Sequence, residues 1–173
     1  MMAASESCEV CGFHWNSISS SEIPVRTTAA TAQFVDVVRT STVPVGTRPS
    51  PDRWSILEYG AHMRDVFISI RERIIRASIE DEHVGGQLYR NERVNLGLYA
   101  LDQPDEVATE LQAMSRLFIR TFEALPPGYE KRTFTYSTIT NQQVTILWAG
   151  AQALHECEHH LGDVRENERL LSV

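Results

Sequence analysis

Apolar residues recur at intervals of three and four along four long stretches of the chain, which is the pattern of helices that bury one face. The stretches are 24–40, 53–79, 103–126 and a last one from about 140 or 141 to 171. In the third stretch the repeated apolar residues are Val107, Leu111, Met114, Phe118 and Phe122. The pattern therefore predicts four long helices.

Helix-start signals precede two of these stretches. Ser50 followed by Pro51 predicts a capped start for the second helix directly after Asp52. Pro104 with acidic neighbours predicts the start of the third helix, because carboxylates favour the positive N-terminal end. The stretch 83–102 has no clear period, so we expect a long loop there with one short helical turn.

The segment RTFTYSTIT, residues 132–140, alternates β-branched and aromatic residues with polar ones. That alternation predicts a short strand or an extended crossover before the last helix. Four long helices with so little strand predict an all-α fold, a four-helix bundle. The interior of such bundles is a known place for metal sites built from facing helices.

Size and charge limit the function classes. The 173 residues suffice for one core, which we assign to residues 23–173, with residues 1–22 as a separate N-terminal segment. No stretch reaches the roughly 20 apolar residues of a membrane span, and the N-terminus does not read as a secretory signal, so we expect a cytoplasmic protein without a membrane partner. A net charge of −7 without a basic block argues against nucleic acid.

Candidate chemistry is concentrated in LHECEHHLGDVR, residues 154–165. On a helix, residues four apart lie within about 40° of each other around the axis, whereas neighbours differ by about 100°. Two pairs can therefore each face one ion: His155 with His159, and Glu156 with His160. The two pairs point in different directions, so one metal takes one pair.

The first pair completes a literal H-E-x-x-H, the zinc-peptidase signature in which Glu156 would activate water. Arg165 occupies the next ligand position of the extended signature, and only eight residues follow it. A small zinc peptidase is therefore retained as a minor alternative.

The second pair needs a ligand from another helix, and His62 on the second helix offers one. Glu58 and Asp65 lie one turn before and after His62 and are expected to receive its second ring N–H, as outer carboxylates often do. Asp163 is expected to do the same for His160. Two histidines, one carboxylate and an open position suit zinc or another divalent ion that activates a thiol or water.

Two motifs resemble the DinB-like superfamily, particularly its DinB-2 branch. They are W-S-I-L-E-Y-G-A-H-M-R-D-V on the second helix and L-H-E-C-E-H-H-L-G-D-V on the last, and the resemblance extends over roughly residues 24–170. The resemblance implies a DinB-type bundle related to mycothiol-dependent maleylpyruvate isomerases, with one divalent metal held by the second and last helices. Matched residue by residue, the ligands are His62, Glu156 and His160, with Asp163 as the trailing acid. An alignment shifted by one residue would instead choose His155 and His159.

The resemblance also implies a function: a transferase or isomerase that binds a low-molecular-weight thiol, such as mycothiol or bacillithiol, and presents it to an electrophile. Zinc is the first choice of metal, with nickel, manganese and iron as alternatives. The main rival is a non-catalytic metal-binding or stress-related protein of the same fold. Pairing of two bundles into a homodimer through an exposed helix face is compatible with such a fold.

Cys8 and Cys11 form a CxxC pair followed by Gly12, which resembles one knuckle of a zinc ribbon. A complete site needs two more ligands, and His155 with His159 would supply them if the N-terminal segment docks on the last helix. His14 is a nearer substitute for one of them. The alternatives are a reduced tail without metal and a redox dithiol.

Overall fold

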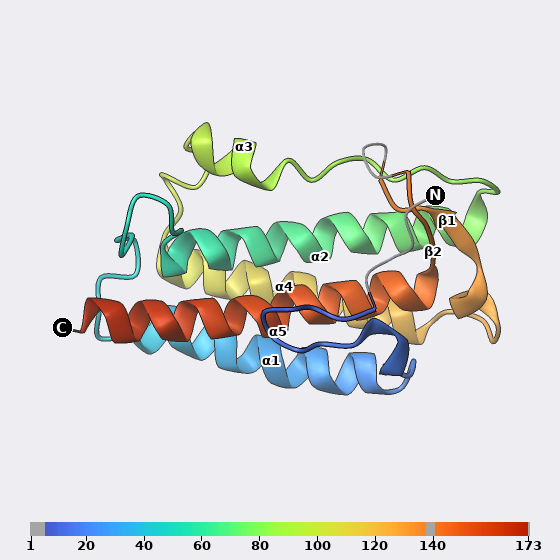
Figure 1. Cartoon of the computed structure of the whole chain (residues 1–173), viewed down its shortest axis with the longest axis horizontal. Helices are drawn as coiled ribbons and strands as arrows, with labels where there is room; N and C mark the ends of the chain where they lie inside the picture. The colour runs from blue at the N-terminus through green and yellow to red at the C-terminus, as the bar shows by residue number, and fades with distance from the viewer. Residues whose placement is uncertain (1–5, 138–140, 173) are drawn as a thin grey trace.

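Four long helices packed side by side dominate the computed structural model, which describes residues 6–137 and 141–172 (Figure 1). They are α1 (Glu22–Thr40), α2 (Ile56–Ile79), α4 (Pro104–Glu123) and α5 (Ile146–Leu171). Helices α1 and α5 run in one direction along the bundle, and α2 and α4 run in the other. The predicted all-α four-helix bundle is confirmed.

The order of neighbours around the bundle differs from the order of the helices along the chain. Both α1 and α2 pack extensively against α4 and α5, but they touch each other only slightly, so these two consecutive helices lie at opposite corners. The connection from α2 to α4 returns along the outside of the bundle and carries the short helix α3 (Arg90–Asn95), as Figure 1 shows. This connection matches the predicted loop with one short helical turn. It lies over the outer side of α2.

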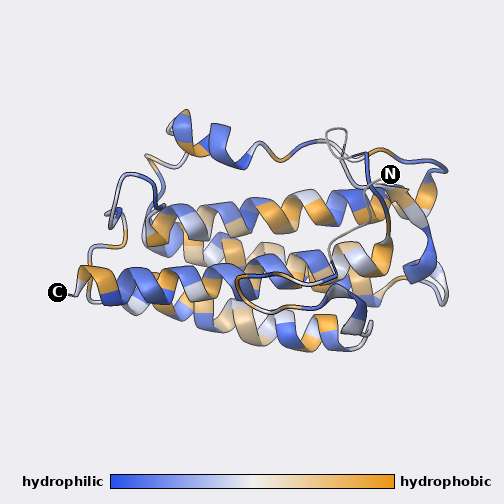
Figure 2. Ribbon diagram, in the orientation of Figure 1, coloured by the Kyte–Doolittle hydropathy of each residue, from blue (hydrophilic) through white to orange (hydrophobic). Residues whose placement is uncertain are grey.

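Large apolar side chains fill the space between the four helices. Phe34, Phe67 and Phe118 are fully buried, one each from α1, α2 and α4, and Leu154 of α5 joins them. Burying a side chain of this size stabilises the fold by about 1.5–3 kcal/mol. Figure 2 shows apolar and polar residues alternating along each helix. None of the helices that the structure describes has both the length and the apolar character needed to cross a bilayer.

Helix α2 begins at Ile56, so the predicted start after Ser50, Pro51 and Asp52 is wrong. Ser55 is the cap: its side chain accepts a hydrogen bond from the Glu58 backbone N–H at 3.1 Å, and Glu58 Oε2 accepts one from the Ser55 N–H at 2.8 Å. This reciprocal capping box satisfies two backbone donors at once, whereas a start at Ser50 would place Arg53 where the box needs Glu or Gln.

The extended segment before the last helix is a small hairpin. Strands β1 (Thr133–Thr135) and β2 (Gln143–Thr145) are antiparallel, with Phe134 opposite Val144. Part of the predicted extended stretch, residues 138–140, lies outside the described residues. Because β2 pairs with β1, α5 begins at Ile146 rather than at 140 or 141, and the Thr145 side chain caps it by accepting from the Trp148 N–H at 3.0 Å.

Two short 3-10 helices, η1 (Trp15–Ser17) and η2 (Tyr129–Lys131), complete the described elements. The segment that contains η1 lies along α5 in Figure 1. Phe13, Trp15 and Ile18 are buried in the same apolar cluster as the helices, so this segment is docked on the bundle.

Candidate metal centre

Three of the predicted ligands meet between α2 and α5. His62 lies in the second turn of α2, and Glu156 and His160 lie one turn apart on α5, so both α5 side chains point to the same side. Glu156 Oε2 is 3.6 Å from His62 Nε2 and 3.3 Å from His160 Nε2. The three candidate ligand atoms lie within 4.8 Å of one another. The cluster is enclosed, with His62 only 1% and His160 only 9% exposed.

Hydrogen bonds from neighbouring residues fix the orientation of both α5 side chains. Gln152 Nε2 donates to Glu156 Oε1 at 2.7 Å, which leaves Oε2 for the two histidines. His160 Nδ1 lies 2.8 Å from Asp163 Oδ2, and an N–H donated there turns Nε2 toward Glu156. Arg53 Nη2 in turn donates to Asp163 Oδ1 at 3.2 Å. The two α5 side chains are therefore positioned in advance of any ligand.

The charges in the cluster are set by burial and by mutual contact. Burial alone would raise the pKa of Glu156, but the contacts with His160 and His62 hold that pKa well below its usual value. Burial lowers the pKa of His62, so its imidazole is neutral, as a metal ligand must be. Burial opposes a charge on His160, yet hydrogen bonds to Asp163 and Glu156 raise its pKa. An ionised carboxylate thus lies between two imidazoles.

The predicted roles of Glu58 and Asp65 beside His62 are wrong. Glu58 takes part in the capping box of α2 and accepts from Arg48 Nη2 at 2.5 Å. Asp65 accepts from Arg93 Nη1 at 2.6 Å and from the Tyr99 hydroxyl at 2.9 Å. Helical spacing places both carboxylates on the same face of α2 as His62. Both nevertheless form hydrogen bonds with residues outside the helix and not with the imidazole.

His62 is held by packing instead of by a carboxylate. The Trp54 ring lies 5.2 Å from the His62 ring, centroid to centroid, and the His160 ring lies at the same distance. Both His62 ring nitrogens are buried, and the described residues give neither of them a hydrogen-bond partner. One of these nitrogens can therefore bind a metal ion on the side of Glu156 without breaking a hydrogen bond that the described residues make.

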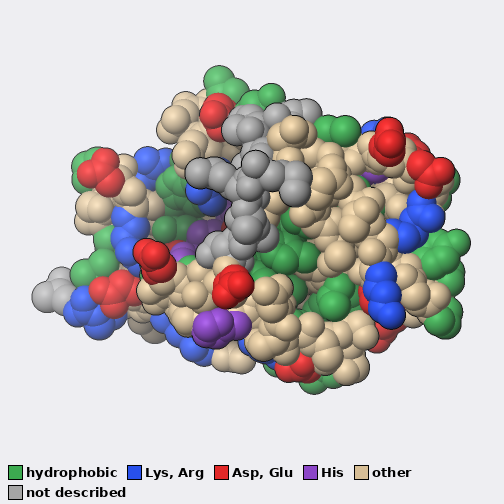
Figure 3. Space-filling model, turned by 45° about the vertical axis from the view of Figure 1, so that its right-hand side comes forward, with side chains coloured by type: hydrophobic (Ala, Val, Ile, Leu, Met, Phe, Trp, Pro, Cys, Tyr) green, Lys and Arg blue, Asp and Glu red, His purple; other side chains and the backbone are tan. Residues whose placement is uncertain are grey.

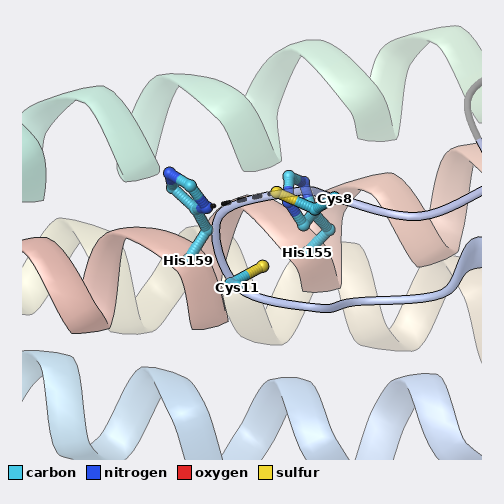
Figure 4. A group of neighbouring side chains, drawn as sticks. All are labelled: Cys8, Cys11, His155 and His159. Atoms are coloured by element: carbon cyan, nitrogen blue, oxygen red, sulfur yellow. Dashed lines mark hydrogen bonds between the residues drawn. The ribbon is translucent and has the colours of Figure 1, made fainter.

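His155 and His159, the other pair of side chains four residues apart on α5, point to the N-terminal segment, as Figure 4 shows. Cys8 Sγ lies 3.8 Å from His159 Nδ1, and candidate ligand atoms of Cys8, Cys11, His155 and His159 all lie within 4.8 Å of one another. The H-E-x-x-H motif is therefore divided between two faces of α5. Among the described residues, its two histidines and its glutamate do not gather around one point.

A cavity of about 440 Å³ opens beside the first cluster, with His62 and Glu156 in its wall. This volume is within the usual range of small-molecule sites. Histidine side chains are visible in a recess of the face drawn in Figure 3. Other lining residues come from α2, the α2–α4 connection, the hairpin and α5, and include Arg73, Leu88, Arg90, Tyr136, Trp148 and Gln152.

Arg73 and Tyr136 supply the polar wall of this cavity and were not predicted from the sequence. The Arg73 guanidinium lies 4.5 Å from the centre of the Tyr136 ring, and its Nη2 donates to the Gly86 carbonyl at 2.5 Å. Neither of these partners is an anion, and no ion pair joins Arg73 to another described residue, so its buried positive charge can meet an anionic ligand. Burial raises the pKa of Tyr136 to about 12, which keeps its hydroxyl protonated as a donor.

Comparisons with known proteins identify the family of the chain. The family model of the DinB superfamily matches residues 26–164. A similar solved structure is YfiT from Bacillus subtilis, described as "a probable metal-dependent hydrolase with an unusual four-helix bundle topology". The two sequences are 16% identical, and the superposition covers 88% of this chain and 89% of the YfiT chain with a TM-score of 0.79. The two proteins therefore share the fold. No curated protein matches the chain. With the family model spanning most of its length, the chain belongs to the DinB superfamily.

Proposed function

We propose that this protein is a metal-dependent enzyme that activates a low-molecular-weight thiol and delivers it to a small electrophile, as a transferase or an isomerase. The observation that carries the proposal is the buried cluster of His62, Glu156 and His160 in the wall of a 440 Å³ cavity. The description of YfiT as a probable metal-dependent hydrolase supports the metal dependence.

The residues of the cluster fit a divalent cation. Two imidazoles and one carboxylate, with ligand atoms within 4.8 Å of one another, are a common donor set for catalytic zinc and leave a position for a further ligand. His62 has two buried nitrogens without a partner among the described residues, and a cation would take up one of them. Bound there, zinc would lower the pKa of a thiol or water that coordinates it.

The thiol must be supplied by a second substrate. The chain has three cysteines, and none of them lines the cavity: Cys8 and Cys11 lie on the other face of α5, and Cys157 is buried between the helices. Burial raises the pKa of Cys157 to about 12, so its thiol stays protonated. Mycothiol or bacillithiol is the class of thiol we propose, in a reducing cytoplasm that maintains such thiols.

The side chains of the cavity wall have separate tasks in this reaction. Arg73 binds an anionic group of the thiol or the electrophile, and the Tyr136 hydroxyl donates a hydrogen bond to it. Leu88 and Trp148 exclude water from the reacting sulfur. In a transfer, the thiol loses its proton to a base in solution, its sulfur bonds to the electrophilic carbon, and the leaving group departs with the electrons of the broken bond.

Metal analysis and a thiol screen test this function together. Pure protein, His62→Ala and Glu156→Gln would be compared for metal content and for consumption of electrophiles with mycothiol, bacillithiol or water alone. We expect both variants to lose one equivalent of metal and all thiol-dependent turnover. His14→Ala serves as the control, because His14 is exposed and lies outside the cluster.

Two results would overturn the proposal. Turnover that needs metal but proceeds equally well without any thiol would identify a hydrolase in which water takes the thiol's place. A protein that keeps its metal in His62→Ala would show that the cluster is not the metal site.

A further inference from the structure

We propose a second metal site, formed by Cys8, Cys11, His155 and His159, which binds zinc and fastens the N-terminal segment to α5. This site can exist whether or not the proposed activity does, because its four ligands are different residues from His62, Glu156 and His160. Cys8 and Cys11 come from a loop, and His155 and His159 come from consecutive turns of α5 (Figure 4).

The spacing of the four side chains fits tetrahedral zinc. Zinc bonds of about 2.0–2.3 Å place tetrahedral ligand atoms roughly 3.3–3.8 Å apart. Cys8 Sγ and His159 Nδ1 are 3.8 Å apart, and all four candidate atoms lie within 4.8 Å of one another. Small side-chain adjustments therefore suffice to close the site around one ion, with no movement of the helix.

The backbone of the loop is folded in the way that a metal knuckle requires. The Gly12 N–H donates to the Cys8 carbonyl at 2.8 Å, and the Cys8 N–H donates to the Phe13 carbonyl at 2.8 Å. Gly12 has φ +71°, a conformation that glycine adopts without strain. The backbone N–H groups of Cys11 and Val10 also lower the pKa of Cys8 by hydrogen bonding to its sulfur, against the effect of burial. The turn thus brings both sulfurs to one side.

His155 is the observation that points to a ligand. Its side chain is packed between Phe13 and Trp15, at ring centroid distances of 5.2 and 4.6 Å. Both of its ring nitrogens are buried, and the described residues offer neither of them a hydrogen bond. Burial lowers the pKa of His155, so the imidazole is neutral. A buried polar group without a partner is costly, and a metal bond to one nitrogen removes that cost.

Zinc explains this cluster better than a redox dithiol does. The cysteines are not joined in a disulfide, and a disulfide would leave both buried nitrogens of His155 without a partner. Two thiolates balance the charge of Zn²⁺, and two neutral imidazoles complete the four-coordinate sulfur and nitrogen set that zinc prefers. The tip of the loop is open to solvent, with Val10 83% exposed, so apolar burial does not hold this side chain against the bundle.

Cobalt substitution and metal counting on the full chain test the site. We expect two equivalents of zinc in the wild type and in His14→Ala, and one equivalent in His62→Ala and in Cys8→Ser/Cys11→Ser. The cobalt form of the wild type and of His62→Ala should show thiolate-to-cobalt charge-transfer absorption in the near ultraviolet. The double cysteine variant should lose this absorption.

The two proposed sites can fail separately. Absence of the charge-transfer absorption from the wild type would overturn the second site, and this measurement does not depend on the folding of any variant. The same holds if Cys8→Ser/Cys11→Ser binds as much zinc as the wild type, or if Cys8 and Cys11 form a disulfide in the metal-loaded protein. If only His62→Ala retains full metal, the proposed enzyme centre fails and the second site stands.

Discussion

Gln152 connects the N-terminal segment to the candidate metal centre, and its replacement by alanine is expected to weaken metal binding there. Gln152 Nε2 donates to Glu156 Oε1 at 2.7 Å, and Gln152 Oε1 accepts from the Trp15 indole N–H at 2.7 Å. The indole N–H therefore fixes which end of the amide faces the carboxylate. Gln152→Ala removes the donor that holds Glu156 in place and leaves the Trp15 N–H without its acceptor.

The size of the effect follows from the kind of hydrogen bond that is lost. A bond to a charged acceptor contributes about 1.5–3 kcal/mol. Glu156 retains 15% exposure, so water replaces part of the lost donor and the cost lies in the lower part of that range. Removing an outer partner of a metal ligand typically reduces affinity about 10- to 100-fold. We therefore expect the dissociation constant of zinc at this centre to rise roughly 10-fold or more.

Competition with a chromophoric chelator measures this constant directly. The titration belongs in the Cys8→Ser/Cys11→Ser background, so that only the centre at His62 takes up zinc. Gln142→Ala is the matched control, because Gln142 also lines the cavity, and among the described residues only its backbone carbonyl makes a hydrogen bond, accepted from the Tyr136 N–H at 2.8 Å. Equal affinities in Gln152→Ala and its parent, or an equal loss in Gln142→Ala, would refute the reasoning.

Three further expectations concern stability and reactivity. Ser55→Ala removes the capping box with Glu58 and should cost about 1–2 kcal/mol, read as a decrease in Tm of about 2–4 °C per kcal/mol. Phe67→Ala, at a fully buried position 5.4 Å from the ring of Phe118, should cost about 3–5 kcal/mol in urea unfolding. Cys157, with its pKa raised to about 12, should resist iodoacetamide at pH 8.5 while the two metal-free N-terminal cysteines react, as counted by mass spectrometry.

Each of these expectations has a control in the same chain. Ser78→Ala removes a hydroxyl in the last turn of α2 that donates to the Ile74 carbonyl, and should leave Tm nearly unchanged. Ile68→Ala alters an exposed neighbour of Phe67 and should cost less than about 1 kcal/mol. Cys157 should react once urea unfolds the protein. A Tm loss in Ser78→Ala equal to that in Ser55→Ala, or rapid labelling of native Cys157, would contradict the burial and capping arguments.

The four helices could be predicted because their signal is local. Apolar positions at intervals of three and four define the buried face wherever the helix docks. The division of the 155–160 region into two pairs follows from the same arithmetic, since a rigid helix fixes the angle between neighbouring side chains. His62 was identified from the stripe on its helix and from the family motif.

The partners of side chains could not be predicted as well, because they come from distant segments. Glu58 and Asp65 lie at the expected positions along α2, but Arg48 and Arg93 approach from the flanking connections and take their carboxylates. Tyr136 enters the cavity from the hairpin, a placement that depends on tertiary packing. Arg73 did carry a local signal, since the spacing 62, 66, 69, 73 continues the stripe of His62.

Helix α5 carries ligands of both proposed centres, and two contacts connect them. Asp163 Oδ2 is hydrogen-bonded to His160 Nδ1 at 2.8 Å and lies 3.8 Å from His159 Nε2, so one carboxylate lies beside an imidazole of each pair. On the other side, Trp15 packs on His155 and reaches Glu156 through Gln152. Zinc that holds the N-terminal segment in place would therefore preorganise Glu156. Zinc at Cys8 would then raise the affinity of the His62 centre for its metal. Because such coupling is reciprocal, a metal at His62 would raise the affinity of the Cys8 site for zinc by the same factor.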